Sequence, residues 1–205
     1  MSKPVILFDA DGFLLDFITP ALRIASEIVS LDKHGVVNPA YYKIEDFPTW
    51  DIFDTIGKEY VEACYAEYGK PGFCAAFEPY PGAVEGVREA KKIADVVVVT
   101  SPLHSPTWCH ERKQSLHQHF GIPRQDVIFA SRKTLVKGRM LVDDHPSHVE
   151  AWAHENHDSN VAILWDQPYN RRHALVDAWN VTRCSSWTDP GGLLEAIERV
   201  ARTHK

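Results

Sequence analysis

The chain has 205 residues, of which 44% are hydrophobic and 24% are charged. This composition excludes a disordered, collagen-like or coiled-coil protein, and the length predicts one compact domain or one domain with a modest insertion. The formal net charge of -6 provides no general attraction for nucleic-acid polymers or anionic membranes. This net charge does not exclude a small anionic substrate held at one local site.

The first predicted element is a buried strand, and a long helical stretch follows it. Val5–Phe8 is a short apolar run, which favours a strand buried in a sheet. Residues 17–78 contain no comparable run, whereas Leu22–Val29 and Ile56–Tyr68 have helical spacing. We therefore expect a helical insertion over 17–78, with a return to the main fold at Pro79–Gly82, where proline and glycine favour turns.

Strands and helices alternate over the rest of the chain. Four further apolar runs predict strands, at Ala94–Val99, Val127–Ala130, Met140–Val142 and Val161–Leu164. Helical patterns occur at Gly82–Ala94, Thr107–Phe120 and Gly191–Ala201. Continuous apolar runs are typical of strands covered on both faces. The alternation therefore predicts the α/β class, with a Rossmann-like doubly wound parallel sheet.

Neither secretion nor membrane insertion is predicted. The apolar run at the N-terminus is too short for a signal peptide, and no stretch approaches 18 apolar residues. The four cysteines, at positions 64, 74, 109 and 184, form no C-x-x-C pair, and a chain of this size needs no disulfides. We expect a cytoplasmic protein with reduced, mostly buried cysteines.

The strongest chemical signal is Asp9-Ala10-Asp11-Gly12, directly after the first predicted strand. Side chains two residues apart on an extended backbone point the same way, so both carboxylates can face one pocket. Open α/β sheets bind ligands at the carboxyl ends of their strands. Two adjacent acids repel each other and need a cation or a shared proton. The alternative for this motif alone is an Asp-Gly turn that ends a strand.

Three more polar groups follow later strands. Thr100-Ser101 comes after Ala94–Val99, Lys133 comes shortly after Val127–Ala130, and Asp143-Asp144 closes Met140–Val142. Each has an ordinary alternative: a turn, a solvated surface charge, or a cap for a helix beginning near Pro146. Their joint order, at the ends of successive strands, favours one shared site.

This set resembles the four motifs of the haloacid-dehalogenase (HAD) superfamily, and more specifically the 5'(3')-deoxyribonucleotidase family. The resemblance covers nearly the whole chain and is weakest over 30–65. Segments that resemble the nucleotidases are Asp9–Phe17, Pro71–Phe73, Glu78–Ala83, Thr100–Pro102 and Ser186–Asp189, together with the ten-residue step from Lys133 to Asp143. The resemblance implies a HAD-like catalytic core formed by 1–16 and 79–205, and a small helical cap at 17–78 that selects the substrate.

It also implies a phosphomonoesterase mechanism. Asp9 would be the nucleophile that forms an aspartyl-phosphate, and Asp11 would be the general acid and base. Thr100, Ser101 and Lys133 would bind the phosphoryl oxygens.

The implied cofactor is Mg²⁺, a hard ion that prefers oxygen ligands. Asp9, the backbone carbonyl of Asp11, and Asp144 would hold it, with Asp143 in support. Eleven histidines are present, but clustered ones such as His117 and His119 do not share a helix face, so we expect no histidine metal site.

Aromatic residues of the cap are implied to stack on the nucleobase. Phe17 and Tyr68 match positions in the family pattern, and Phe47 or Trp50 could supply another ring. The alternative for each is a core aromatic side chain.

The expected function is hydrolysis of deoxyribonucleoside monophosphates. Two alternatives stay open: a HAD phosphatase for another small phosphate ester, such as a sugar or glycolate phosphate, and a non-catalytic receiver-type phospho-acceptor domain. A small nucleotide is the expected partner, with neither a nucleic-acid polymer nor a membrane, and a homodimer is implied as possible by the resemblance.

Overall fold

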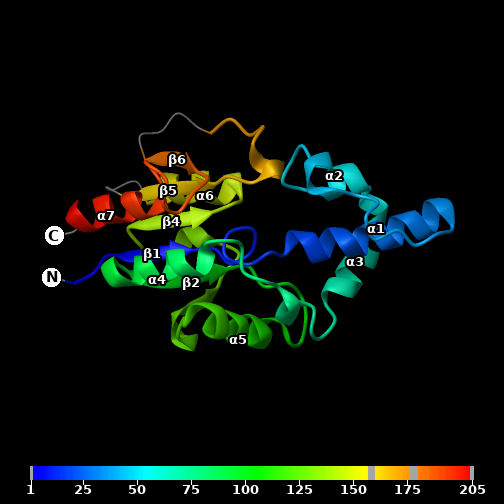
Figure 1. Cartoon of the computed structure of the whole chain (residues 1–205), viewed down its shortest axis with the longest axis horizontal. Helices are drawn as coiled ribbons and strands as arrows, with labels where there is room; N and C mark the ends of the chain where they lie inside the picture. The colour runs from blue at the N-terminus through cyan, green and yellow to red at the C-terminus, as the bar shows by residue number, and fades with distance from the viewer. Residues whose placement is uncertain (1, 157–159, 176–179, 204–205) are drawn as a thin grey trace.

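The computed structural model describes residues 2–156, 160–175 and 180–203. A six-stranded parallel sheet lies at its centre, with strand order β3-β2-β1-β4-β5-β6. In chain order the strands are β1 (Val5–Phe8), β2 (Asp95–Thr100), β3 (Val127–Phe129), β4 (Met140–Asp143), β5 (Val161–Trp165) and β6 (Val181–Cys184). Because every pair is parallel, all six carboxyl ends reach one edge of the sheet, next to the helical insertion (Figure 1).

Helices cover both faces of the sheet. Ile6 and Phe8 of β1 belong to the apolar core that includes side chains of α4, α5 and α7, whereas Leu7 packs in the core with α6. The helices are α4 (Ala83–Ile93), α5 (Trp108–Phe120), α6 (Pro146–Glu155) and α7 (Leu193–Thr203). Since successive strand residues point to opposite faces, the continuous apolar runs are explained by burial on both sides. The expected doubly wound α/β fold is confirmed.

Residues 17–78 form a separate group of helices at the carboxyl edge of the sheet (Figure 1). They comprise α1 (Ile18–His34), η1 (Ile44–Asp46), α2 (Phe53–Ile56), η2 (Lys58–Tyr60), α3 (Val61–Tyr68) and η3 (Cys74–Ala76). Helices α1, α2, η2 and α3 share a second apolar core, which includes Leu22, Val29 and Cys64, whereas Cys74 of η3 belongs to the core of the sheet. The two ends of this segment lie side by side where they join the sheet domain, and the Asp16 N–H donates to the Glu78 carbonyl at 2.9 Å.

Three short helical turns complete the described secondary structure: η4 (Arg124–Asp126), η5 (Lys133–Leu135) and η6 (Pro168–Asn170). Among the described residues no helix is long and apolar enough to cross a membrane. All four cysteines are free, and only Cys109 is exposed.

The sequence patterns missed one strand, shortened one helix and lengthened another. The predicted helix Ile56–Tyr68 is α3 (Val61–Tyr68) preceded by the turn η2, because Gly57, with φ +116°, ends α2 at Ile56. The strand β6 contains Thr182 and Arg183 and lies at the edge of the sheet, so it lacks the apolar run that marks the buried strands. The helix α1 extends from Ile18 to His34, beyond the predicted Leu22–Val29 at both ends. Its first turn is partly buried, with Ile18 and Ala21 in the core, whereas residues 31–34 at its C-terminal end are exposed.

Candidate active site

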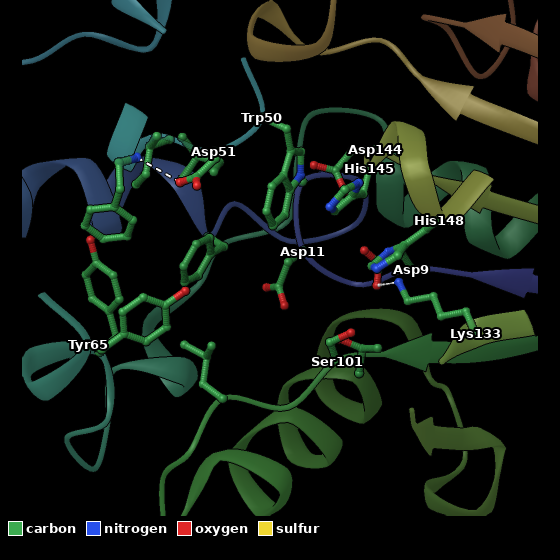
Figure 2. Close-up of a pocket in the computed structure, with 18 of the residues that line it drawn as sticks. Asp9, Asp11, Trp50, Asp51, Tyr65, Ser101, Lys133, Asp144, His145 and His148 are labelled. Atoms are coloured by element: carbon green, nitrogen blue, oxygen red, sulfur yellow. Dashed lines mark hydrogen bonds and ion pairs between the residues drawn. The ribbon is translucent and has the colours of Figure 1, made fainter. Parts of the chain in front are cut away.

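The loop after β1 carries two carboxylates into a cavity at the carboxyl edge of the sheet (Figure 2). The Asp9 N–H donates to the Val142 carbonyl at 2.9 Å, which fixes Asp9 beside β4. Gly12 then turns the chain with φ +73°, and a Cβ there would lie 2.2 Å from Asp144 Oδ2. Glycine is therefore required both by the backbone conformation and by the close approach of Asp144.

Lys133, at the start of η5, connects the loops after β1 and β4. Its Nζ lies 2.7 Å from Asp9 Oδ1 and 2.7 Å from Asp143 Oδ2, and its side chain is buried. Asp143 also accepts hydrogen bonds from the His145 N–H at 2.8 Å and meets His148 Nδ1 at 3.2 Å. These contacts hold the lysine ammonium beside the carboxylate of Asp9.

Three buried carboxylates form a compact oxygen cluster. One oxygen from each of Asp9, Asp143 and Asp144 lies within 4.8 Å of the others. Tyr169 donates to Asp144 Oδ2 at 2.5 Å, and Asn170 donates to the Asp144 carbonyl at 2.8 Å, so both the side chain and the backbone of Asp144 are fixed. Buried oxygen ligands of this kind suit a hard divalent cation such as Mg²⁺.

The charges of the cluster are unbalanced. Burial raises the pKa of Asp9 to about 7, and the charges of Asp143 and Asp11 add to the rise while Lys133 opposes it. Burial, together with the charges of Asp143 and Asp9, raises the pKa of Asp144 well above its usual range. Burial also acts to raise the pKa of Asp143, but Lys133 and His148 hold it below its usual range. One ammonium therefore does not neutralise three buried carboxylates, and a bound cation would remove the imbalance.

Asp11 has a partner of its own, Arg112 on α5. Arg112 Nη2 donates to Asp11 Oδ1 at 2.6 Å, and the arginine side chain is fully buried. Its guanidinium lies over the rings of Phe77 and Trp108, with its carbon 5.1 and 5.2 Å from their centroids. Burial raises the pKa of Asp11, and the charge of Arg112 limits the rise.

Thr100 and Ser101 line the same cavity at the end of β2. The Thr100 hydroxyl is fully buried and has no hydrogen-bond partner among the described residues. A buried polar atom without a partner is costly, so this hydroxyl points to a ligand that supplies the missing contact.

The cavity has a volume of about 320 Å³, and Phe17, Trp50 and Tyr68 are among the residues that line it. In Figure 2, Trp50 lies beside Asp144 and His145, whereas Asp51 and Tyr65 lie at the end opposite Lys133. The Tyr68 ring stacks on Phe73, and its hydroxyl donates to the Ala21 carbonyl at 2.9 Å, which fixes its orientation.

Trp50 and Phe47 occupy different environments. The Trp50 ring lies 3.9 Å from that of His145 between centroids, so it connects the 17–78 segment with the loop after β4. Phe47 is buried beneath Tyr42 in the core of the segment and does not line the cavity. Phe47 is therefore a core aromatic side chain.

Comparison with known protein families identifies one that matches almost the whole chain. The family described as 5' nucleotidase, deoxy (pyrimidine), cytosolic type C matches residues 3–201. The chain belongs to this family. It is therefore a hydrolase of the 5'-nucleotidase type, a phosphomonoesterase.

Individual nucleotidases of this family are similar over most of their length. A Bordetella bronchiseptica protein named as a 5'(3')-deoxyribonucleotidase is 32% identical over 178 residues, which cover 82% of this chain and 86% of that protein. The human cytosolic-type 5'(3')-deoxyribonucleotidase is 28% identical over 199 residues, which cover 92% of each chain. A haloacid dehalogenase-like hydrolase from Burkholderia xenovorans shares the fold, with a TM-score of 0.54 at 16% identity over all of this chain and 97% of its own.

Two contacts of this nucleotidase site were not predicted from the sequence. Arg112 stands in a polar, histidine-rich helix, where a charged residue is ordinarily solvent-exposed, and only the fold buries it against Asp11. Tyr169 lies in η6, 25 residues after its partner Asp144, and no spacing rule relates the two. The predicted residues Asp9, Asp11, Thr100, Ser101, Lys133 and Asp144 all line one cavity.

Proposed function

We propose that this nucleotidase hydrolyses deoxyribonucleoside monophosphates, releasing the nucleoside and inorganic phosphate. The observation that best supports the proposal is a single cavity lined by both kinds of group. Carboxylates, a lysine and a threonine hydroxyl without a partner line it from the sheet, and aromatic rings line it from residues 17–78. This arrangement is complementary to a phosphate group joined to a flat base.

In the proposed reaction, a carboxylate oxygen of Asp9 attacks the phosphorus atom and the ester P–O bond breaks. Asp11 gives its proton to the departing alkoxide, and the product is an aspartyl-phosphate on Asp9. Asp11, now ionised, takes a proton from a water molecule that attacks the same phosphorus atom. The acyl-phosphate bond breaks, and the carboxylate of Asp9 is restored with Asp11 protonated again.

The surrounding groups bind and orient the phosphoryl group. Lys133 is positioned beside Asp9 to offset charge on the phosphoryl oxygens, and Thr100 and Ser101 offer hydroxyl groups to them. We assign Mg²⁺ to Asp9, Asp144 and the backbone carbonyl of Asp11, with Asp143 in support. When bound, Mg²⁺ neutralises negative charge on the phosphate.

We also propose that 17–78 acts as a cap that selects the substrate, on a catalytic core formed by 1–16 and 79–205. Phe17, Trp50 and Tyr68 belong to this segment and line the cavity. Stacking on aromatic rings tolerates different bases, so these residues would fix the class of substrate more than the base itself.

A test of the proposed function is phosphate release from a panel of deoxy- and ribonucleoside monophosphates and sugar phosphates. The panel is run with Mg²⁺ and with EDTA, beside the Asp9→Asn variant. We expect Mg²⁺-dependent turnover of deoxynucleotides that Asp9→Asn abolishes. Turnover confined to sugar or glycolate phosphates would contradict the nucleotide assignment. Stable self-phosphorylation without turnover would favour the receiver-type alternative.

Two further expectations belong to the proposal. We infer a cytoplasmic location, in keeping with four free cysteines and a cytosolic-type human relative. A homodimer stays a prediction, which light scattering of the purified protein would test.

A further inference from the structure

The loop after β5, residues 166–170, holds two loops of the active site although it does not line the cavity. The Gln167 side-chain amide donates to the Gly12 carbonyl at 2.6 Å, which fixes the loop after β1. The Tyr169 hydroxyl donates to Asp144 Oδ2 at 2.5 Å, which fixes the loop after β4. Both donor side chains are buried, so water has little access to either hydrogen bond. The loop after β5 is therefore part of the framework that holds the carboxylate cluster.

This loop is anchored to the edge strand β6 by hydrogen bonds of its own. Asn170 Oδ1 accepts from the Gln167 N–H at 3.1 Å and from Arg183 Nη1, on β6, at 2.7 Å. Arg183 also donates to Asp166 at 3.0 Å. Tyr169 lies between these anchored residues in the chain and is only 1% exposed. Its hydroxyl therefore reaches its acceptor from a fixed support.

The hydrogen bond from Tyr169 occupies one side of the Asp144 carboxylate. Gly12 lies against the same side, because a Cβ there would be 2.2 Å from Asp144 Oδ2 and 2.6 Å from the Tyr169 hydroxyl oxygen. Oδ2 is thus enclosed by a hydroxyl group and by backbone, and a rotation of the carboxylate would break the hydrogen bond. Oδ1 is therefore the oxygen that Asp144 can offer to a cation in the cluster with Asp9 and Asp143.

Magnesium and calcium ions differ in what they require of such a carboxylate. Mg²⁺ needs nearly octahedral ligands at about 2.0–2.1 Å, whereas Ca²⁺ takes about six to eight oxygens at about 2.3–2.6 Å and can bind both oxygens of one carboxylate. Selectivity between the two ions depends on the number and the flexibility of the ligands. A carboxylate that presents one fixed oxygen suits Mg²⁺ and denies Ca²⁺ an additional ligand.

We propose that Tyr169 is a positioning residue that holds Asp144 to one coordinating oxygen and so makes the metal site favour Mg²⁺ over Ca²⁺. In this role Tyr169 contacts neither the substrate nor the cation, and it acts through Asp144. The inference rests on the metal assignment of the proposed function. It adds the residue that determines which divalent cation the site prefers.

The test measures the dissociation constants of Mg²⁺ and of Ca²⁺ by isothermal titration calorimetry, with the metal-stripped wild type and Tyr169→Phe. Phenylalanine keeps the buried ring and removes only the hydroxyl. We expect Mg²⁺ binding to weaken by about 10- to 100-fold, the usual loss when the hydrogen-bond partner of a metal ligand is removed. Ca²⁺ binding should stay equal or tighten, because the released carboxylate can offer both oxygens. The preference for Mg²⁺ should therefore fall by at least the factor that Mg²⁺ binding loses.

The Mg²⁺ dependence of turnover gives a second readout, which a merely structural role would not move. In Tyr169→Phe the Mg²⁺ concentration needed for half-maximal turnover of a deoxynucleotide should rise. Added Mg²⁺ should overcome most of the loss of turnover, because Asp9 and Asp11 keep their own contacts in this variant. A loss that added Mg²⁺ does not restore, with both dissociation constants unchanged, would contradict the proposal.

Tyr60→Phe is the matched control. The Tyr60 hydroxyl donates to Asp32 Oδ2 at 2.6 Å, and neither residue is among those that line the cavity. This variant loses the same kind of tyrosine–carboxylate hydrogen bond, so both dissociation constants should match those of the wild type. Gln167→Met removes the bond from the same loop to the Gly12 carbonyl and leaves Tyr169 in place, so the preference for Mg²⁺ should be kept. Urea unfolding of each metal-free variant verifies that it is folded.

The outcomes separate this inference from the function on which it rests. An unchanged ratio of the two dissociation constants in Tyr169→Phe would overturn the role of Tyr169, and so would an equal loss of preference in Gln167→Met. A wild type that binds Ca²⁺ as tightly as Mg²⁺ would also overturn it, and that result needs no variant. None of these results would affect the proposed hydrolysis, which phosphate release from deoxynucleotides measures. Binding of neither ion to the wild type would overturn the metal assignment itself.

Discussion

At the scale of single residues, the hydroxyl of Thr100 makes no hydrogen bond within the described part of the chain. It is fully buried and has no hydrogen-bond partner among the described residues, although it stands at the catalytic end of the cavity. Replacing such a hydroxyl by a methyl group of the same shape is neutral or stabilising for the fold. The loss of the Thr100 hydroxyl should therefore lower the rate of the reaction and leave the stability of the fold unchanged or higher.

We predict that Thr100→Val lowers kcat/KM by about 10- to 100-fold, the loss expected for one hydrogen bond to the phosphoryl group, by analogy with an oxyanion-hole donor. The midpoint of urea unfolding should stay equal or rise. Thr100→Ser, which keeps the hydroxyl, should retain most of the activity. A destabilised Thr100→Val protein with normal kinetics would show that the hydroxyl is structural.

Burial raises the pKa of Asp11, and Arg112 is the side chain that most opposes this rise. Its guanidinium donates to Asp11 at 2.6 Å, and its charge opposes the rise that burial imposes on the pKa of Asp11. In Arg112→Met this opposition is lost, so the pKa of Asp11 rises further. Asp11 then keeps its proton to higher pH, and the alkaline limb of kcat/KM should move to higher pH.

We also expect kcat to fall by about 10- to 100-fold in Arg112→Met, because Asp11 loses its orientation as general acid and base. Arg112→Lys should restore part of the rate and part of the pH profile. Lys113→Met, at the next position of α5 and outside the cavity lining, is the control. An unshifted pH profile in Arg112→Met would contradict the assignment.

At the scale of elements, α5 joins the catalytic core to the end of the 17–78 segment. The carboxylate of Glu111 accepts hydrogen bonds from the Gly72 N–H at 2.9 Å and the Ala75 N–H at 3.1 Å. Burial acts to raise the pKa of Glu111, but hydrogen bonds from Thr107 and these two N–H groups lower it below the ordinary value of 4.5. The ionised carboxylate is therefore the form that stabilises the contact.

We predict that Glu111→Gln lowers the free energy of unfolding at pH 7 by about 1 kcal/mol, a value reduced for solvent exposure. Because the folded-state pKa is depressed, this contribution is present above pH 4.5 and is lost as the pH falls through the folded-state pKa. Wild-type and Glu111→Gln unfolding curves should thus converge as the pH falls through the depressed folded-state pKa of Glu111. Glu62→Gln, exposed on α3, should match the wild type at every pH. A difference that persists at low pH would contradict the prediction.

At the scale of the whole molecule, a divalent cation should stabilise the fold by relieving the buried carboxylates of Asp9, Asp143 and Asp144. The pKa of Asp9 is about 7, so a proton competes with the cation at and below neutral pH. We predict that Mg²⁺ raises the thermal midpoint more at pH 8 than at pH 6. The binding free energy should weaken by at most about 1.4 kcal/mol per pH unit for one displaced proton.

The measurement is thermal unfolding with EDTA or with excess Mg²⁺, at matched ionic strength. In Asp9→Asn the pH dependence of the Mg²⁺ effect should be reduced, because that position no longer binds a proton. An equal rise in the midpoint at both pH values in the wild type would contradict the competition. No rise at either pH would contradict the metal assignment.

The sequence by itself determined the α/β class, the order of most strands and helices, and the chemical groups at the strand ends. Short apolar runs and the acids, hydroxyls and lysine that follow them are local features, and parallel strands necessarily bring their carboxyl ends to one edge. That is why Asp9, Lys133 and Asp144, separated by up to 135 residues, could be predicted to meet.

Only the tertiary structure decided which polar and aromatic side chains became buried or faced the cavity. Edge strand β6 has no apolar run, so its sequence does not distinguish it from a loop. Arg112 looks like a surface residue until α5 packs beneath Asp11, and Phe47 and Trp50 look equivalent until one is buried and the other lines the cavity. Which side chains are buried, and which of them point into the cavity, depends on contacts between distant segments. No local sequence pattern encodes those contacts.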